Sequence, residues 1–395
     1  MPGTRILSAG LLAGLAASFF VVAPSYAQQT VKIGVILPYS GQFADPGAQI
    51  DNGIKLYMQQ HGDTVAGKKI EIVRRDTGGI APDVAKRLAQ ELIVRDNVDI
   101  LAGFSLSPNA FAVADLSAQA KKFMVLMNAA TAIITTKSPY IVRTSFTLPQ
   151  LNEPLGIWAH KNGVRKVYSM VADFAAGHDA ETAFQTAFKA AGGEIVGSVR
   201  YPVNNPDFSA FVARAKDMNP EGIFVFVPGG AQSPAIAKAM ADRGIDPRKI
   251  KVMSQAELTD EPSLKSMGDS ALGIITSAHY DYNLNNPTNK EFVAAYNAVY
   301  KRNPDFFSVG GYDGMHLIYE ANKKAQGKTD GDALVAAAKG TAWQSPRGPM
   351  SIDPDTRDVV QTVYIRRVEN VGGRLVNVEF DKIENVKDPF KARMK

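Results

Sequence analysis

Short apolar segments of strand length alternate with segments of helical period along most of the chain. In the helical segments, apolar residues recur every three or four positions. This alternation is typical of βαβ units, in which helices cover both faces of a mostly parallel sheet. The predicted strands are Val31–Leu37, Lys69–Arg74, Val98–Phe104, Phe123–Met127, Lys166–Val171, Glu194–Tyr201, Gly222–Val227, Lys251–Ser254 and Gly273–Ala278.

The predicted helices carry signals at their ends. Pro82 and Pro108 suit the first turn of a helix, and Gly192 and Gly244 suit the position just after the last turn. The predicted helices between the strands are Ala48–His61, Pro82–Arg95, Asn109–Lys121, Ala180–Ala191, Phe208–Met218 and Pro234–Arg243, and later ones are Asn289–Arg302, Gly311–Gln326 and Gly331–Lys339.

The strand and helix series falls into two parts. The first part runs from Val31 to about Met127, an extended segment follows at Tyr140–Pro149, and a second part of similar length begins at Lys166. After the late helices the chain continues as a polar stretch, Ser345–Asp358, and a β-like tail, Val359–Phe380. The sequence therefore predicts an α/β protein with two Rossmann-like lobes, each with a parallel-type central sheet.

The amino terminus has the pattern of a signal peptide. Arg5 precedes a small and apolar run, and Ser25 and Ala27 are the small residues expected before a cleavage site at Gln28. Residues 1–27 are therefore predicted to be removed; the alternative, a membrane anchor, is weaker because the run barely reaches the ~20 residues of a span. With no cysteine in the chain, a lipid tether through cysteine and disulfides are excluded. We expect a soluble exported protein in a Gram-negative periplasm.

Charge and motifs exclude several function classes. The chain has 44 Lys and Arg against 39 Asp and Glu, spread without the basic runs of nucleic-acid or membrane binders. The five histidines lack metal-ligand spacing, and neither a G-x-S-x-G nucleophile elbow nor a phosphate-binding glycine loop occurs. No catalytic residue, metal or cofactor is predicted.

Five polar, small-residue turns follow predicted strands, where open α/β sheets bind ligands. Ser107, in the turn before the second proline-led helix, is a candidate for binding a carboxylate, although it could simply cap that helix. Glu257 is the one charged candidate, although it could be a solvated turn carboxylate. The five turns are 38–43, 105–109, 128–131, 228–231 and 254–257.

The sequence resembles a known family over nearly all of the expected mature chain. The similar segments are Val31–Gly41 (VKIGVILPYSG), Pro82–Lys86, Met127–Thr131, Tyr140, Val142–Thr144, Asp207–Phe208 and Tyr312–Gly314. These segments are similar to the type I periplasmic solute-binding proteins of ABC importers, in the leucine/isoleucine/valine-binding family. The tail segments Ser345–Pro349 and Ile352–Pro354 resemble a subgroup thought to bind aromatic carboxylates.

The resemblance implies a three-segment hinge with ligand between the lobes. The crossings fall near Phe146–Pro149, Ser277–Tyr280 and Asp358–Val363. The N-terminal lobe then comprises 28–147 plus 279–358, and the C-terminal lobe 148–278 plus 359–395. The resemblance places carboxylate-binding turns at Ser105/Ser107 and Ala129/Thr131, and an acidic residue for an amino acid's α-ammonium at Ala256 or, with a one-residue shift, at Glu257. The expected ligand-binding residues are Tyr39, Phe43, Ser105, Ser107, Ala129, Thr131, Phe174, Gly230, Glu257 and Phe307.

The expected function is capture of a small carboxylate by hinge closure and its delivery to a membrane permease with cytoplasmic ATPases. The resemblance implies that amino-acid binders have aromatic residues where this chain has Pro46, Ala176 and the turn that contains Gly230. The smaller residues leave room for a bulkier ligand, which favours an aromatic acid over a branched-chain or other aliphatic amino acid. A sensory ligand-binding module and, less favoured, a secreted hydrolase are the alternatives. A monomer is expected.

Overall fold

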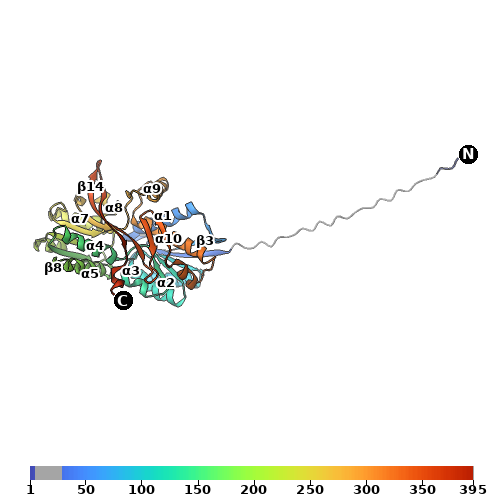
Figure 1. Cartoon of the computed structure of the whole chain (residues 1–395), viewed down its shortest axis with the longest axis horizontal. Coiled ribbons are helices and arrows are strands. Elements are labelled where there is room, and N and C mark those ends of the chain that lie inside the picture. The colour runs from blue at the N-terminus through green and yellow to red at the C-terminus, as the bar shows by residue number, and fades with distance from the viewer. Residues whose placement is uncertain (5–28, 395) are drawn as a thin grey trace.

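The computed structural model describes residues 1–4 and 29–394, so the predicted signal peptide falls mainly outside the described residues. The described chain forms two α/β lobes, one built on the blue and cyan segments and one on the green and yellow segments (Figure 1). The two central sheets confirm the predicted fold class. Among the described residues, no helix combines the length and apolar character required to cross a membrane.

The first lobe is built on a six-stranded sheet with the order β2-β3-β1-β4-β5-β6. All neighbouring strands pair in parallel except β2 and β3. The strands are β1 (Thr30–Leu37), β2 (Thr64–Val65), β3 (Lys68–Asp76), β4 (Ile100–Gly103), β5 (Phe123–Leu126) and β6 (Ile141–Arg143). Its early helices are η1 (Gly41–Phe43), α1 (Ala44–His61), α2 (Pro82–Val94), α3 (Ser107–Gln119) and η2 (Ala132–Thr136).

Helices from the end of the chain return to the first lobe. The orange helix α10 lies beside the blue α1 (Figure 1), and α11 packs on β5 and β6. These helices are α9 (Pro287–Tyr300), α10 (Phe306–Lys324) and α11 (Gly331–Ala338). The late part of the chain thus completes the packing of a sheet formed by the first 143 residues.

The second lobe is built on a nine-stranded sheet with the order β12-β13-β14-β11-β10-β9-β7-β8, and β15 pairs with β14. Its central strands are parallel, whereas β14 runs antiparallel to β11. The strands are β7 (Lys166–Ala172), β8 (Glu194–Tyr201), β9 (Gly222–Phe226), β10 (Lys251–Gln255), β11 (Ile275–Ala278), β12 (Ala342–Ser345), β13 (Gly348–Ile352), β14 (Val359–Val371) and β15 (Arg374–Val386). The helices are α4 (Leu148–Lys161), α5 (Ala175–Ala190), α6 (Ser209–Asp217), α7 (Gln232–Asp242), η3 (Ala256–Thr259), α8 (Glu261–Met267), η4 (Gly268–Ala271) and α12 (Pro389–Ala392).

The helix-end signals are confirmed, but the late part of the chain contains a strand that the sequence does not predict. Helix α2 begins at Pro82, and Gly192 takes a positive φ of 104° just after α5 ends. The interpretation of Ser345–Asp358 as a polar stretch missed β13, which pairs with β12 and β14. The sequence pattern does not predict β13 because the strand has only five residues and two of them, Gly348 and Pro349, are depleted in strands.

Helices α1 and α10 approach closely through glycine. A Cβ added to Gly53 would lie 1.9 Å from the Ser308 carbonyl oxygen, and one added to Gly311 would lie 2.0 Å from the Ile50 carbonyl oxygen. Neither neighbour is a flexible side chain, so a methyl group at either position must push the helices apart. This close contact joins the amino-terminal helix to the late helix that returns to the first lobe.

We expect Gly53→Ala and Gly311→Ala each to lower the free energy of unfolding by about 2 kcal/mol or more, because overpacking displaces backbone. Urea denaturation with an unchanged m-value measures this loss. In an uncrowded helix the same substitution stabilises by up to about 1 kcal/mol. A gain in stability would therefore contradict the close contact.

Candidate ligand-binding site

A small cavity, which we call the interlobe cavity, lies where the carboxyl ends of strands from the two sheets face each other. Its volume is ≈ 20 Å³. The residues that line it lie at the carboxyl ends of β4, β5, β7, β9 and β10, in the turns and first helical residues that follow these strands, or at the start of α4. They are Ser105, Leu106, Ser107, Asn128, Ala130, Leu148, Phe174, Ala176, Phe226, Pro228 and Glu257.

The first lobe contributes hydroxyl groups to this cavity. Ser107 Oγ accepts hydrogen bonds from Thr131 Oγ1 at 2.9 Å and from the Thr131 N–H at 3.3 Å. The hydroxyl proton of Ser107 is therefore left to donate to a ligand. The alternative that Ser107 caps the helix is wrong, because Leu106 is the N-cap residue and Ser107 is the first residue of α3.

A buried arginine holds Thr131 in place. Arg143 Nη2 donates to the Thr131 carbonyl oxygen at 2.7 Å, and Arg143 Nη1 forms a 3.3 Å ion pair with Asp358. Both charged side chains are buried, with exposed fractions of 0 and 1%. Asp358 lies at the start of the third predicted crossing, so this chain of contacts connects that predicted crossing to Ser107.

Aromatic rings from the second lobe form another wall. Phe174 and Phe226 both line the interlobe cavity, and their ring centroids lie 5.8 Å apart. Phe307, from the first lobe, lies beside Gly229: a Cβ added to Gly229 would be 3.4 Å from the Phe307 ring and 3.8 Å from Glu257 Cβ. Phe307 and Glu257 therefore lie on either side of the Gly229 turn.

Glu257 is buried rather than solvated, so the alternative of a solvated turn carboxylate is wrong. Its exposed fraction is 4%, and Oε2 has no hydrogen-bond partner. Burial, with a further contribution from the charge of Asp260, raises the pKa of Glu257 to about 8. At neutral pH the folded protein therefore presents Glu257 as an uncharged acid.

The remaining predicted residues are Ala129, Gly230, Phe43 and Tyr39, and their contacts differ. The Ala129 N–H donates to the Phe104 carbonyl oxygen at 2.8 Å, and neighbouring Ala130 lines the cavity. Gly230 has φ of 64°, and a Cβ there would lie 2.5 Å from the Gln42 carbonyl oxygen and 3.7 Å from Phe43, so these two predicted residues meet across the lobes. The Tyr39 hydroxyl donates to Asp51 at 3.2 Å, and Tyr39 is not among the residues that line the interlobe cavity, so its ligand contact stays a prediction.

The sequence interpretation did not single out several lining residues as ligand contacts. Asn128 and Pro228 belong to predicted turns, and Asn128 Nδ2 donates to the Ser105 carbonyl oxygen at 2.8 Å. Phe226 ends a strand, which marked it as core, and Leu148 starts a helix after the extended segment. The rule that parallel strands end at the ligand site could have found Phe226.

Comparisons with known proteins agree with this geometry. Residues 30–373 match the family model described as "Periplasmic binding protein". This protein belongs to the periplasmic binding protein family. It is 43% identical to "Leu/Ile/Val-binding protein homolog 6" of Brucella melitensis over 383 residues, which cover 96% of this chain and 97% of that protein.

Two solved structures of ABC-transporter solute-binding proteins are also similar to this periplasmic binding protein. One, from Rhodopseudomonas palustris BisB5 in complex with 3,4-dihydroxybenzoic acid, has a TM-score of 0.89 and 53% identity, and the match covers 92% of this chain and 99% of that one. The other, from Rhodopseudomonas palustris HaA2 in complex with p-hydroxybenzoic acid, has a TM-score of 0.90 and 42% identity, with 92% and 100% covered.

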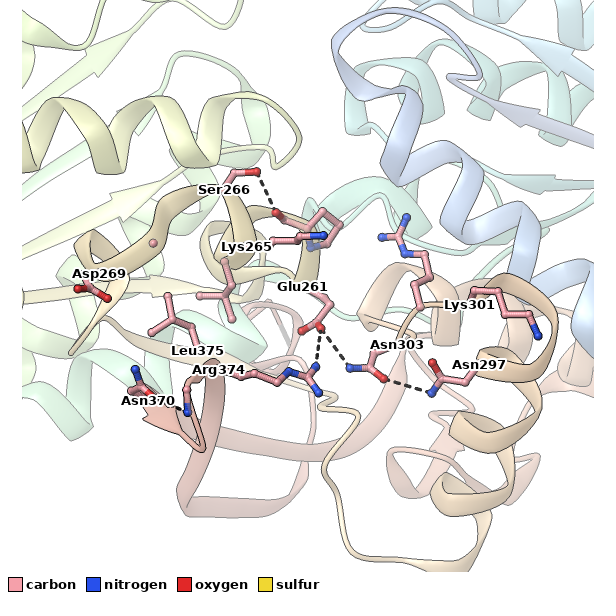
Figure 2. A pocket seen from close by; sticks show the side chains of 15 residues that line it. Glu261, Lys265, Ser266, Asp269, Asn297, Lys301, Asn303, Asn370, Arg374 and Leu375 are labelled. Carbon is pink, nitrogen blue, oxygen red and sulfur yellow. Dashed lines mark hydrogen bonds and ion pairs between the residues drawn. The ribbon is translucent and has the colours of Figure 1, made fainter.

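A second and larger cavity of this periplasmic binding protein, which we call the outer groove, has a volume of ≈ 1010 Å³. It lies between α8 and the β14–β15 turn of the second lobe and the end of α9 in the first (Figure 2). Glu261 points into it, where its carboxylate accepts a 3.1 Å hydrogen bond from Asn303 and lies 3.8 Å from Arg374. Because Glu261 already has these partners, the outer groove is a weaker candidate for the ligand site.

The segment from Glu257 to Glu261 carries buried acids between the two cavities. Asp260 and Asp305, from opposite lobes, line one small cavity together with Asp281 and Arg366. Burial and the nearby charge of Asp305 raise the pKa of Asp260 to about 8. Burial also raises the pKa of Asp305 to about 6, and the charge of Arg302 opposes this rise.

Because folding raises the pKa of Asp260 from 3.8, the folded protein binds a proton that the unfolded chain releases above pH 4. Stability should therefore fall as pH rises from about 4 to about 8, by up to about 1.4 kcal/mol per pH unit for each such acid. Asp260→Asn keeps a capping side chain for the Ser263 N–H and should flatten this slope.

Denaturation at several pH values measures the slope for the unmodified protein and the variant. Asp330→Asn is the matched control, because Asp330 caps α11 in the same way from an exposed position. Identical slopes for Asp260→Asn and the unmodified protein would show that Asp260 does not bind the proton.

Proposed function

We propose that this protein is the extracytoplasmic solute-binding component of an ABC uptake transporter and that its solute is an aromatic carboxylate. One observation carries the proposal: the interlobe cavity joins the hydroxyls of Ser105 and Ser107 from one lobe to the rings of Phe174 and Phe226 from the other. Hydroxyl donors suit a carboxylate, and flanking rings suit an aromatic ring. The benzoic acids bound by the two similar structures support this class of solute.

Closure of the lobes is the proposed mechanism. The carboxylate docks first on the turns after β4 and β5, and the second lobe then brings Phe174, Phe226 and Glu257 onto the ring. The ligand stabilises the closed form only by the contacts that it makes there and lacks in the open form. The closed form is the state that a membrane permease would recognise, and we propose the periplasm as its location, in agreement with the family and the signal-like residues 1–27.

Catalysis is not part of the proposal. A secreted hydrolase would need a base beside a serine, but both hydrogen bonds that Ser107 Oγ accepts come from Thr131. The proteins that this chain resembles are solute-binding proteins. Binding without turnover is therefore the proposed activity.

Calorimetric titration of the purified protein with benzoate, 4-hydroxybenzoate and leucine tests the class of solute. We expect at least one benzoate to bind more tightly than leucine by about 100-fold or more, which corresponds to about 2.7 kcal/mol. Tight binding of leucine with no response to the benzoates would contradict the proposal.

Ser107→Ala should weaken the benzoate that binds by about 1–3 kcal/mol, because a buried carboxylate loses a hydroxyl donor. Thr131→Val should weaken it less, and the double variant should lose little more than Ser107→Ala alone, because Thr131 acts through Ser107. Titration of all three variants measures these losses. Ser198→Ala, an exposed serine on β8, is the control and should bind normally. Unchanged affinity in Ser107→Ala would remove this hydroxyl from the site.

A further inference from the structure

Glu257 has a fixed backbone and one carboxyl oxygen, Oε2, without a hydrogen-bond partner. Its carbonyl oxygen accepts a 2.7 Å hydrogen bond from Ser233 Oγ, and a Cβ added to Gly229 would lie 3.8 Å from the Glu257 Cβ. Glu257 lines the interlobe cavity and is 4% exposed, while Oε2 has no hydrogen-bond partner. Leaving a buried polar group without a partner costs about 1–3 kcal/mol, so this atom indicates a ligand group that would satisfy it.

Arg366, whose charge acts on Glu257, forms its hydrogen bonds with other groups. The Arg366 guanidinium donates to Asp281 Oδ2 and to the Tyr280 carbonyl oxygen, both at 3.0 Å, and to Thr276 Oγ1 at 3.1 Å and 3.3 Å. Its charge lowers the pKa of Glu257, but burial and Asp260 outweigh it. The carboxyl group is therefore protonated at neutral pH and can both donate and accept a hydrogen bond.

We propose that Glu257 recognises a hydroxyl group on the ligand's aromatic ring, at a ring position away from the carboxylate that Ser105 and Ser107 bind. This inference rests on the proposed function and names the substituent that the site selects. A phenolic hydroxyl matches the carboxyl group of Glu257, because each group can donate and accept. A methyl group of similar size offers no hydrogen bond and leaves Oε2 unsatisfied.

The position of the hydroxyl on the ring follows from the placement of the serines and Glu257 on opposite lobes. The serine hydroxyls belong to the first lobe and Glu257 to the second, with Phe174 and Phe226 also on the second-lobe side. A ring that spans the cavity carries its carboxylate toward one lobe and its far edge toward the other. A para hydroxyl therefore suits the site, whereas an ortho hydroxyl remains beside the carboxylate.

Titration of the full mature chain with 4-hydroxybenzoate, 2-hydroxybenzoate, 4-methylbenzoate and benzoate tests the proposal. In the unmodified protein we expect 4-hydroxybenzoate to bind at least about 10-fold more tightly than 4-methylbenzoate, the ratio that one satisfied buried group provides. Glu257→Leu should bring this ratio close to one, and Glu257→Gln, which keeps a neutral hydrogen-bonding head group, should preserve most of it. Glu261→Gln, in the outer groove, is the matched control and should leave the ratio unchanged.

The outcomes separate this inference from the proposed function. If no aromatic acid binds the unmodified protein, the proposed function fails and this inference fails with it. If aromatic acids bind but the unmodified protein does not prefer the para hydroxyl, or Glu257→Leu keeps the preference, this inference alone is wrong. The absence of a para-hydroxyl preference in the unmodified protein overturns this inference without any variant. Where Glu257→Leu does not fold, Glu257→Ala is titrated in its place, and it should also bring the ratio close to one.

Discussion

The buried ion pair between Arg347 and Asp313 joins the parts of the chain that meet between the lobes. Arg347 Nε donates to Asp313 at 2.8 Å, and its Nη1 donates to the Ser145 carbonyl oxygen at 2.8 Å and to Gln361 at 2.9 Å. Asp313 belongs to α10, Ser145 directly precedes the first predicted crossing, and Gln361 belongs to β14. Removing one member of a buried pair costs about 3–5 kcal/mol because the other charge remains in a low-dielectric interior. The pair therefore holds three distant segments in one arrangement.

A second buried network of charged groups connects the late part of the chain to the candidate ligand site. Asp358, at the third predicted crossing, contacts both Arg143 and Lys391 of α12. Arg143 in turn holds Thr131, whose hydroxyl and N–H hold Ser107. The buried charges of Asp358, Arg143 and Lys391 thus orient the serine that lines the cavity.

The predicted strands and helices of both lobes agree with the structure because apolar period and helix-end residues act locally. The turns at 105–109, 128–131 and 228–231 converge on one cavity because parallel strands all end at the same edge of their sheets. The same local patterns do not predict β13, because it is five residues long and contains Gly348 and Pro349.

By itself, the sequence determined the α/β class, the order of the elements and the strand ends at which polar turns occur, since these depend on short-range periodicity and on proline and glycine geometry. Only the tertiary structure decided the protonation of Glu257 and the roles of Ser107 and Arg143. A glutamate is charged in water, and burial favours its neutral form because burial removes its solvation. Residues far apart in the sequence produce this burial: Glu257 and Phe43, for example, both pack near the turn formed by Gly229 and Gly230. The chemistry of the site is therefore a property of the packed lobes.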